Sequence, residues 1–218
     1  MQYFTFLGVG TLPEGYEEAL YSFEDNKEEI HASKYVQSAI IEKFQSDISE
    51  VFVFCTEKSY SLGARNIKNE IKTKFNIDIK FITINEFVKI EEILQKMNEV
   101  LKEDFIIDVT HSFRNIPISV TMISNYLEVS TKKQLKHLFY GNYNRETNEG
   151  LIIDLINQYE NSKIASSLMA FDQFLKISDT YLYNLNDNKI NNLMKGIYQF
   201  NHMLDYCEFD SCVHSISQ

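Results

Sequence analysis

The chain has 218 residues, 44% of them hydrophobic, and a formal net charge of −10, so it can bury one full core plus a small appendage. The acidic balance argues against binding of long nucleic acid, which depends on clustered Lys and Arg. No run of about 20 apolar residues and no basic-then-apolar N-terminus is present, so we expect a cytoplasmic protein with no membrane segment.

Strand-like and helical runs alternate over most of the chain. We expect strands at 3–9, 51–56, 79–84, 105–109, 135–140 and 151–155, and helices at 33–44, 61–75, 86–102 and 116–129. The first, second and fourth strands are nearly continuous apolar runs, as in parallel strands buried on both faces. The alternation predicts an α/β, Rossmann-like, mostly parallel sheet with right-handed crossovers.

The last two expected strands have a different connection. A polar loop with a glycine at each end, Gly141 and Gly150, joins them, and it has no room for a helix. This pattern predicts an antiparallel hairpin at one edge of the sheet.

The character of the chain changes near residue 157. One apolar stripe, at alternating spacings of four and three, predicts a long helix through Ile164, Leu168, Phe171, Leu175, Ser178, Leu182 and Leu185. A second helix is expected after a break at 184–188, from Ile190, Leu193, Met194, Ile197 and Leu204. We therefore divide the chain into a ligand-binding domain, 1–157, and a helical extension, 158–218. The stripe either packs on the sheet domain, meets its twin in a dimer or leads into an effector domain.

The most informative segment runs from Phe105 to Pro117, where an apolar strand passes through a polar turn into a helix. Pro117 falls in the first turn of the helix, where a missing N–H costs nothing. The free N–H groups and positive dipole end of that helix favour an anion, and His111 and Arg114 add donors. The alternative is that Asp108 and Ser112 merely cap the helix, but capping gives no reason to place His and Arg together.

Open α/β sheets bind ligands at the carboxyl ends of their strands, where the strand order reverses. That rule places residues 8–11 beside residues 110–114, with 56–61 nearby. The candidate ligand-binding residues are Gly8, Gly10, Thr11, Thr56, Ser59, Ser61, Thr110, His111, Ser112, Phe113 and Arg114. The third glycine of a dinucleotide fingerprint is absent, so we expect no cofactor, and we assign no catalytic residue.

The distribution of charge along the chain agrees with a site for a small ligand. Residues 109–145 hold five basic residues against one acidic residue, a local basic island that suits a small anion. Lys132, Lys133 and Lys136 are each better explained as solvated surface residues.

The three cysteines lack metal-type pairing, and we expect reduced thiols. Cys207 and Cys212, near His202 and His214, are too irregularly spaced to favour a metal site.

The polar turn also resembles a known motif. Asp108-x-Thr110-His111-Ser112-Phe113-Arg114-x-x-Pro117 is similar to the Asp-x-Thr-His-Gly-Phe-Arg-x-x-Pro signature of CRISPR-associated proteins with a CARF domain, the ring-oligonucleotide sensors of type III systems. Ser112 stands where the family usually has Gly. Segments at 6–11, 34–37, 51–56 and 139–143 fall in the same order as in the family, and the resemblance extends to about residue 185.

The resemblance implies a homodimer that binds a cyclic oligoadenylate across its two-fold axis, with four adenylates as the preferred ring and six as the alternative. It implies that His111 and the helix N-terminus hold phosphate, while residues 8–11 and 56–61 approach ribose or adenine. Asp108 is expected to fix the turn by accepting backbone N–H bonds.

Family members typically continue into a helical HEPN ribonuclease domain marked by an Arg followed by a His. Arg145 is the last arginine of this chain, so that nuclease is not assigned to it. Two further hypotheses stay open. One is a ring nuclease that cleaves cyclic oligoadenylate by metal-independent attack of the 2′-OH, and the other is a non-enzymatic regulatory or scaffold protein.

Overall fold

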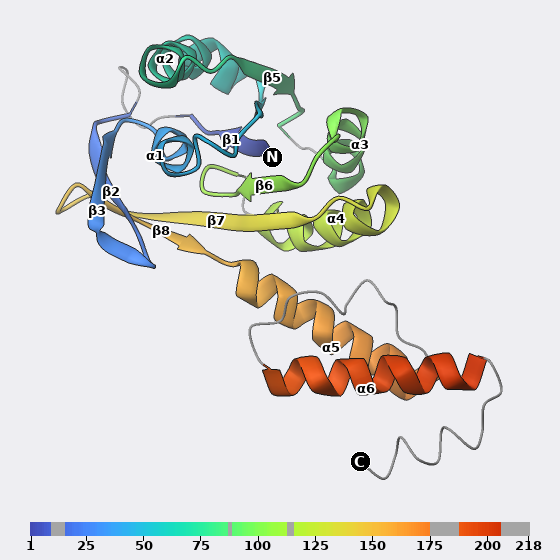
Figure 1. The fold of residues 1–218 in the computed structure, drawn as a ribbon. Coiled ribbons are helices and arrows are strands. Elements are labelled where there is room, and N and C mark those ends of the chain that lie inside the picture. The colour runs from blue at the N-terminus through green and yellow to red at the C-terminus, as the bar shows by residue number, and fades with distance from the viewer. Residues whose placement is uncertain (10–15, 87–88, 113–115, 175–187, 206–218) are drawn as a thin grey trace. The chain divides into compact units, whose positions relative to one another are not determined.

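The computed structural model describes residues 1–9, 16–86, 89–112, 116–174 and 188–205 (Figure 1). The chain divides into two compact units, Met1–Ile156 and Asn157–Gln218. The first unit holds an eight-stranded, mostly parallel sheet with helices on both faces, which confirms the predicted Rossmann-like α/β fold. The sheet order is β3-β2-β8-β7-β6-β1-β4-β5.

The elements of the first unit come close to the expected ones. Its strands are β1 (Gln2–Leu7), β2 (Ala19–Phe23), β3 (Asn26–Ser33), β4 (Glu50–Cys55), β5 (Ile79–Thr83), β6 (Phe105–Asp108), β7 (Leu135–Asn144) and β8 (Glu149–Asp154). Its helices are α1 (Val36–Lys43), α2 (Glu57–Phe75), α3 (Ile90–Val100) and α4 (Ile116–Thr131). The second unit holds α6 (Asn188–Asp205) and nearly all of α5 (Ile156–Phe174).

The centre of the sheet is buried on both faces, as the apolar runs predict. Every residue of β1 and β6 is buried. Phe4 stacks on Phe52 with ring centroids 5.1 Å apart, and Phe6 stacks on Phe54 at 5.2 Å. Helices α1 and α2 pack together, as do α3 and α4. Strands β4 and β5 lie on one side of β1, and β6 and β7 lie on the other. Because connections between parallel strands are right-handed, this order puts the two helix pairs on opposite faces of the sheet.

The hairpin of β7 and β8 is antiparallel, as predicted, but its place at the edge is wrong. β8 pairs with β2, and β3 forms that edge of the sheet. The β2–β3 hairpin escaped prediction because acidic and basic residues crowd the segment from Glu24 to Glu29 and hide its alternation. Strand β7 also continues through Gly141 to Asn144 and β8 begins at Glu149, so only residues 145–148 of the expected loop lie outside the strands.

Tyr21 explains why β8 contains a glycine. Tyr21 pairs with Gly150, and a Cβ built on Gly150 would lie 2.3 Å from the Tyr21 ring. Any side chain at position 150 would therefore displace that ring.

Each helix of the second unit has both buried and exposed apolar residues. In α5, Tyr159 and Ile164 are buried while Leu168 is exposed, and in α6 Met194 is buried while Leu193 is exposed. The predicted stripe beyond residue 174 and the predicted break lie mostly outside the described residues. So do Cys207, Cys212 and His214.

Candidate functional site

A hydrogen-bonded network fixes the turn after β6. The Asp108 carboxylate is fully buried and accepts the Thr110 N–H at 2.9 Å and the Thr5 hydroxyl at 2.7 Å. The Thr110 hydroxyl donates to the same carboxylate and accepts the Gly141 N–H at 2.7 Å. The Gln37 amide of α1 donates to the Phe6 carbonyl at 2.9 Å and to the Thr5 hydroxyl at 3.3 Å. The network ties α1, β1, β6 and β7 together, so the turn has a rigid base.

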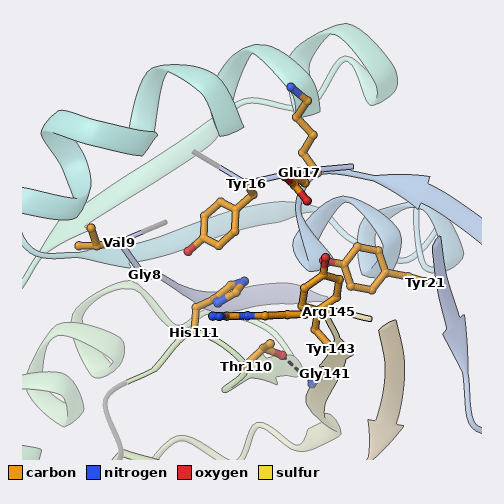
Figure 2. Close-up of a pocket in the computed structure, with 11 residues that line it drawn as sticks. Gly8, Val9, Tyr16, Glu17, Tyr21, Thr110, His111, Gly141, Tyr143 and Arg145 are labelled. Carbon is orange, nitrogen blue, oxygen red and sulfur yellow. Dashed lines mark hydrogen bonds between the residues drawn. The ribbon is translucent and has the colours of Figure 1, made fainter. Parts of the chain in front are cut away.

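A cavity of about 440 Å³ lies at the carboxyl ends of β1 and β6, where the strand order reverses (Figure 2). Gly8 and Val9 after β1 line it, together with Thr110 and His111 from the turn. The expected meeting of the first strand's end with the polar turn is thus present in the described residues.

Gly8 lets the two strand ends approach each other. A Cβ at position 8 would lie 3.0 Å from the Tyr16 hydroxyl oxygen and 3.4 Å from the His111 Cβ. The ring centroids of His111 and Tyr16 lie 4.9 Å apart. Replacing Gly8 would push against both side chains.

His111 is neutral near pH 7. Burial lowers the pKa of its imidazole below the usual 6.5, and the nearby Asp108 carboxylate offsets this only in part. A neutral imidazole has one N–H donor and one acceptor nitrogen. His111 can therefore donate one hydrogen bond to a ligand without carrying a charge.

The charges at the cavity come from other residues. Lys34, Arg145 and Glu17 line it and are exposed. Within the described part of the chain, neither Lys34 nor Arg145 forms an ion pair. Figure 2 shows the Arg145 side chain extended into the site toward His111. Two cations thus outnumber the one carboxylate at the mouth.

Three tyrosines form the aromatic part of the wall. Tyr16, Tyr21 and Tyr143 line the cavity, the last from the strand that also carries Gly141. Burial raises the pKa of Tyr16 to about 12 and that of Tyr21 further, so both phenols stay protonated and can donate hydrogen bonds. The rings offer flat apolar surfaces beside the cations.

The predicted residues at the start of α2 have a structural role. Thr56 caps the helix: its hydroxyl accepts the Ser59 N–H at 3.2 Å, and the Ser59 hydroxyl accepts the Thr56 N–H at 2.9 Å. Both residues line a second cavity of about 660 Å³, to which Gly8, His111 and Ser112 also belong. Ser61 is exposed, donates to the Lys58 carbonyl at 2.9 Å and lines neither of these two cavities.

Ser112, the residue that differs from the family signature, bonds within the turn. Its hydroxyl donates to the Val109 carbonyl at 2.7 Å, and its N–H points to the same carbonyl at 3.1 Å. Gly10, Thr11, Phe113 and Arg114 lie outside the described residues.

The basic island does not form one surface. Lys132 and Lys133 lie just before β7, and Lys136, in its first residues, pairs with Asp104 at 3.3 Å. That is the opposite end of the strands from the cavity, so of the described residues counted in the island, Arg145 alone reaches the site.

Sequence reasoning missed most of the wall of the cavity. Tyr16, Glu17, Tyr21, Lys34, Tyr143 and Arg145 were not assigned to it. The signal was weak: Lys34 opens a segment that resembles the family, and Tyr143 and Arg145 flank the end of β7. The other residues could not be assigned to the cavity, because the β2–β3 hairpin, which places Tyr21, was not predicted.

No family model matches the chain, and no curated protein is similar to it by sequence. The fold defines an α/β protein with a Rossmann-like sheet and a cavity at its switch point. No described helix is long and apolar enough to span a membrane. Among the described residues no group of three or more His, Cys, Asp or Glu is placed to hold a metal ion.

Proposed function

We propose that the protein is a cytoplasmic sensor of type III CRISPR antiviral signalling that binds a cyclic oligoadenylate as a homodimer. Cyclic tetra-adenylate is the preferred ring, and cyclic hexa-adenylate is the alternative. The observation that supports the proposal is the cavity at the switch point, where the motif residues Thr110 and His111 lie beside Lys34 and Arg145.

The chemistry of the cavity matches the parts of a nucleotide. Lys34 and Arg145 can neutralise phosphate, and the His111 N–H can donate to a phosphate oxygen. The tyrosine rings can stack on adenine, which binds aromatic side chains readily. Glu17 disfavours a second phosphate close to it and can accept a hydrogen bond from a ribose hydroxyl or an adenine amino group.

The size of the cavity supports a ligand shared between two subunits. About 440 Å³ lies near the lower end of the roughly 300–1,000 Å³ that small-molecule sites occupy. A ring of four nucleotides is several times larger than one nucleotide, so one cavity suits a part of it. A two-fold axis would present the same cavity to opposite sides of a symmetric ring.

Ring cleavage is the second candidate function. Lys34 and Arg145 form no ion pair within the described residues and are available to stabilise charge on a phosphate under attack. Orienting a ribose so that its 2′-OH lines up with the adjacent phosphorus would open the ring without a metal. The 2′-oxygen forms a bond to phosphorus, the 5′-oxygen leaves with a proton, and a linear product with a 2′,3′-cyclic phosphate results.

One incubation series tests both functions. The full chain is mixed with cyclic tri-, tetra- and hexa-adenylate, and its melting temperature and the integrity of the ring are followed together. A thermal shift with intact ring supports the sensor, and linear product supports the ring nuclease. Neither shift nor cleavage with any ring would refute both and favour a regulatory or scaffold protein.

A further inference from the structure

Four residues form a row across β3, β2, β8 and β7, one from each strand. The register pairs His31 of β3 with Tyr21 of β2, and Tyr21 with Gly150 of β8. Gly150 pairs in turn with Tyr143 of β7. Paired residues in neighbouring strands point their side chains to the same face of a sheet. The row therefore has tyrosines on both sides of a position that lacks a side chain.

The Tyr21 ring fills the space that Gly150 leaves. A Cβ at position 150 would lie 2.3 Å from the Tyr21 Cδ1 and 2.5 Å from its Cε1, so the ring lies directly on the backbone of β8. On the other side Tyr21 has its cross-strand partner His31, which is itself buried. The ring thus leans from β2 over β8, and Figure 2 shows it directed into the cavity.

The hydroxyl group is the part of Tyr21 that the fold does not use. Tyr21 is 7% exposed, so little of its ring is left as a stacking surface. The residue lines the cavity, yet within the described part of the chain its hydroxyl forms no hydrogen bond. A nearly buried hydroxyl normally has a partner, because leaving it without one costs free energy. A molecule bound in the cavity can supply that partner.

Tyr143, in the same row, has the opposite arrangement. Its hydroxyl donates to the Asn148 side-chain oxygen at 2.6 Å, and the residue is 40% exposed. The ring of Tyr143 is therefore available to a ligand, while its hydroxyl is already bonded within the protein. The two tyrosines offer a ligand different groups.

The Tyr21 hydroxyl can serve as a donor at neutral pH. Burial raises the pKa of this phenol above its usual value of 10, and the nearby Tyr143 and Asp108 add to the shift. The phenol therefore keeps its proton. Lys34 and Arg145 line the same cavity and attract an anion, whose oxygens accept hydrogen bonds strongly.

We propose that the Tyr21 hydroxyl donates a hydrogen bond to an oxygen of the bound ring, and that Gly150 is the positioning residue that lets it do so. This role rests on the proposed function and adds to it a polar contact from β2. The oxygen belongs to a phosphate or to a ribose, which both accept a hydrogen bond.

Titration of the full chain with cyclic tetra-adenylate tests the hydrogen bond. Tyr21→Phe should lower the affinity about ten- to a hundredfold. Its melting temperature should stay unchanged, because the hydroxyl has no partner among the described residues. Tyr35→Phe is the matched control: Tyr35 is also buried but lines neither cavity, so its affinity should equal that of the wild type.

The 2′-deoxy analogue of the ring identifies the oxygen. If Tyr21→Phe costs as much affinity with the deoxy ring as with cyclic tetra-adenylate, the acceptor is a phosphate oxygen. If the cost disappears with the deoxy ring, the acceptor is the ribose 2′-oxygen.

A double-mutant cycle tests the positioning by Gly150. Gly150→Ala should displace the Tyr21 ring and lower the affinity for the ring ligand. Adding Tyr21→Phe should then cost nothing more, because the hydroxyl has already left its place. Circular dichroism checks that each variant folds, and Tyr21→Phe decides the hydrogen bond even if Gly150→Ala does not fold.

Three outcomes would overturn these roles. Tyr21→Phe may bind the ring as tightly as the wild type, which excludes the hydrogen bond. It may melt several degrees earlier, which means that the hydroxyl has its partner within the protein. Additive losses in the cycle would exclude Gly150 as the positioning residue.

AMP, which is small enough for one cavity, separates these roles from the proposed function. AMP binding that depends on the Tyr21 hydroxyl, with no binding of any ring, would refute the ring and leave the role of Tyr21 standing. Ring binding that is unchanged in Tyr21→Phe would do the reverse. A wild-type chain that binds neither AMP nor a ring would refute both.

Discussion

The centre of the sheet and the four strands at one side of it, β7, β8, β2 and β3, which we call the wing, differ in how their side chains are buried. In β1 and β6 every side chain is buried, whereas in β2 and β8 buried residues alternate with partly or fully exposed ones. The centre gives the strand ends a fixed position, and the wing supplies Tyr21, Tyr143 and Arg145 to the cavity. The rigid framework of the sheet and much of the aromatic and charged wall of the cavity therefore come from separate parts of one sheet.

The largest expected effect breaks the centre. Phe4 is fully buried and stacks on Phe52, so Phe4→Ala should cost about 3–5 kcal/mol of unfolding free energy. Ile30→Ala, at a 60% exposed position of β3, should change the stability of the isolated subunit by no more than about 0.5 kcal/mol. Urea denaturation of both variants, under conditions where the chain is monomeric, makes the comparison. Similar losses at the two positions would mean that centre and wing do not differ as described.

The same contrast explains what could be predicted from sequence. The continuous apolar runs of β1, β4 and β6 allowed the central strands to be predicted. The strand-to-helix turn at Asp108 indicated where the site lies. Of the other four strands, β7 and β8 were predicted, but β2 and β3 were not, because the charged residues of β3 mask its alternation. Tyr16, Lys34 and Arg145 come to the cavity through long-range pairing of strands, which no local pattern encodes.

Asp108 joins the framework to the site, and its removal should damage both. Asp108→Ala leaves the Thr5 hydroxyl and the Thr110 N–H without their acceptor. We expect a loss of about 2–4 kcal/mol in stability together with weaker ring binding. Asp25→Ala is the control, because that exposed carboxylate pairs with Lys43 at the surface and should contribute little. Weak binding at full stability would instead indicate direct contact between Asp108 and the ligand.

The cations of the cavity should affect binding without affecting the fold. Arg145→Ala and Lys34→Ala each remove an exposed charge, and we expect a loss of about ten- to a hundredfold in affinity for cyclic tetra-adenylate at an unchanged melting temperature. Arg114→Ala and His111→Ala belong to the same titration series. Lys133→Ala, just before β7 at the end away from the cavity, is the matched control. Equal affinity in the control and in all four variants would remove the cavity from consideration.

The smallest effect concerns pH. The folded protein holds the pKa of His111 below 6.5, the ordinary value that applies when it is unfolded. Below pH 6.5 the unfolded chain therefore binds a proton that the folded chain resists, and stability falls with pH until the lowered pKa is passed. His111→Gln should show a shallower decline in urea midpoints between pH 7.5 and 5.5, since every other titratable group is the same in both proteins. Parallel curves would show that His111 is not held neutral.

Calorimetric titration of the wild-type chain with cyclic tetra-adenylate tests the central claim most directly, with the Lys34→Ala/Arg145→Ala double variant beside it. The account predicts saturation at one ring per two chains for the wild type and loss of measurable heat for the double variant, with both proteins equally folded. One ring per monomer, no binding by the wild type, or undiminished binding by the double variant would contradict it.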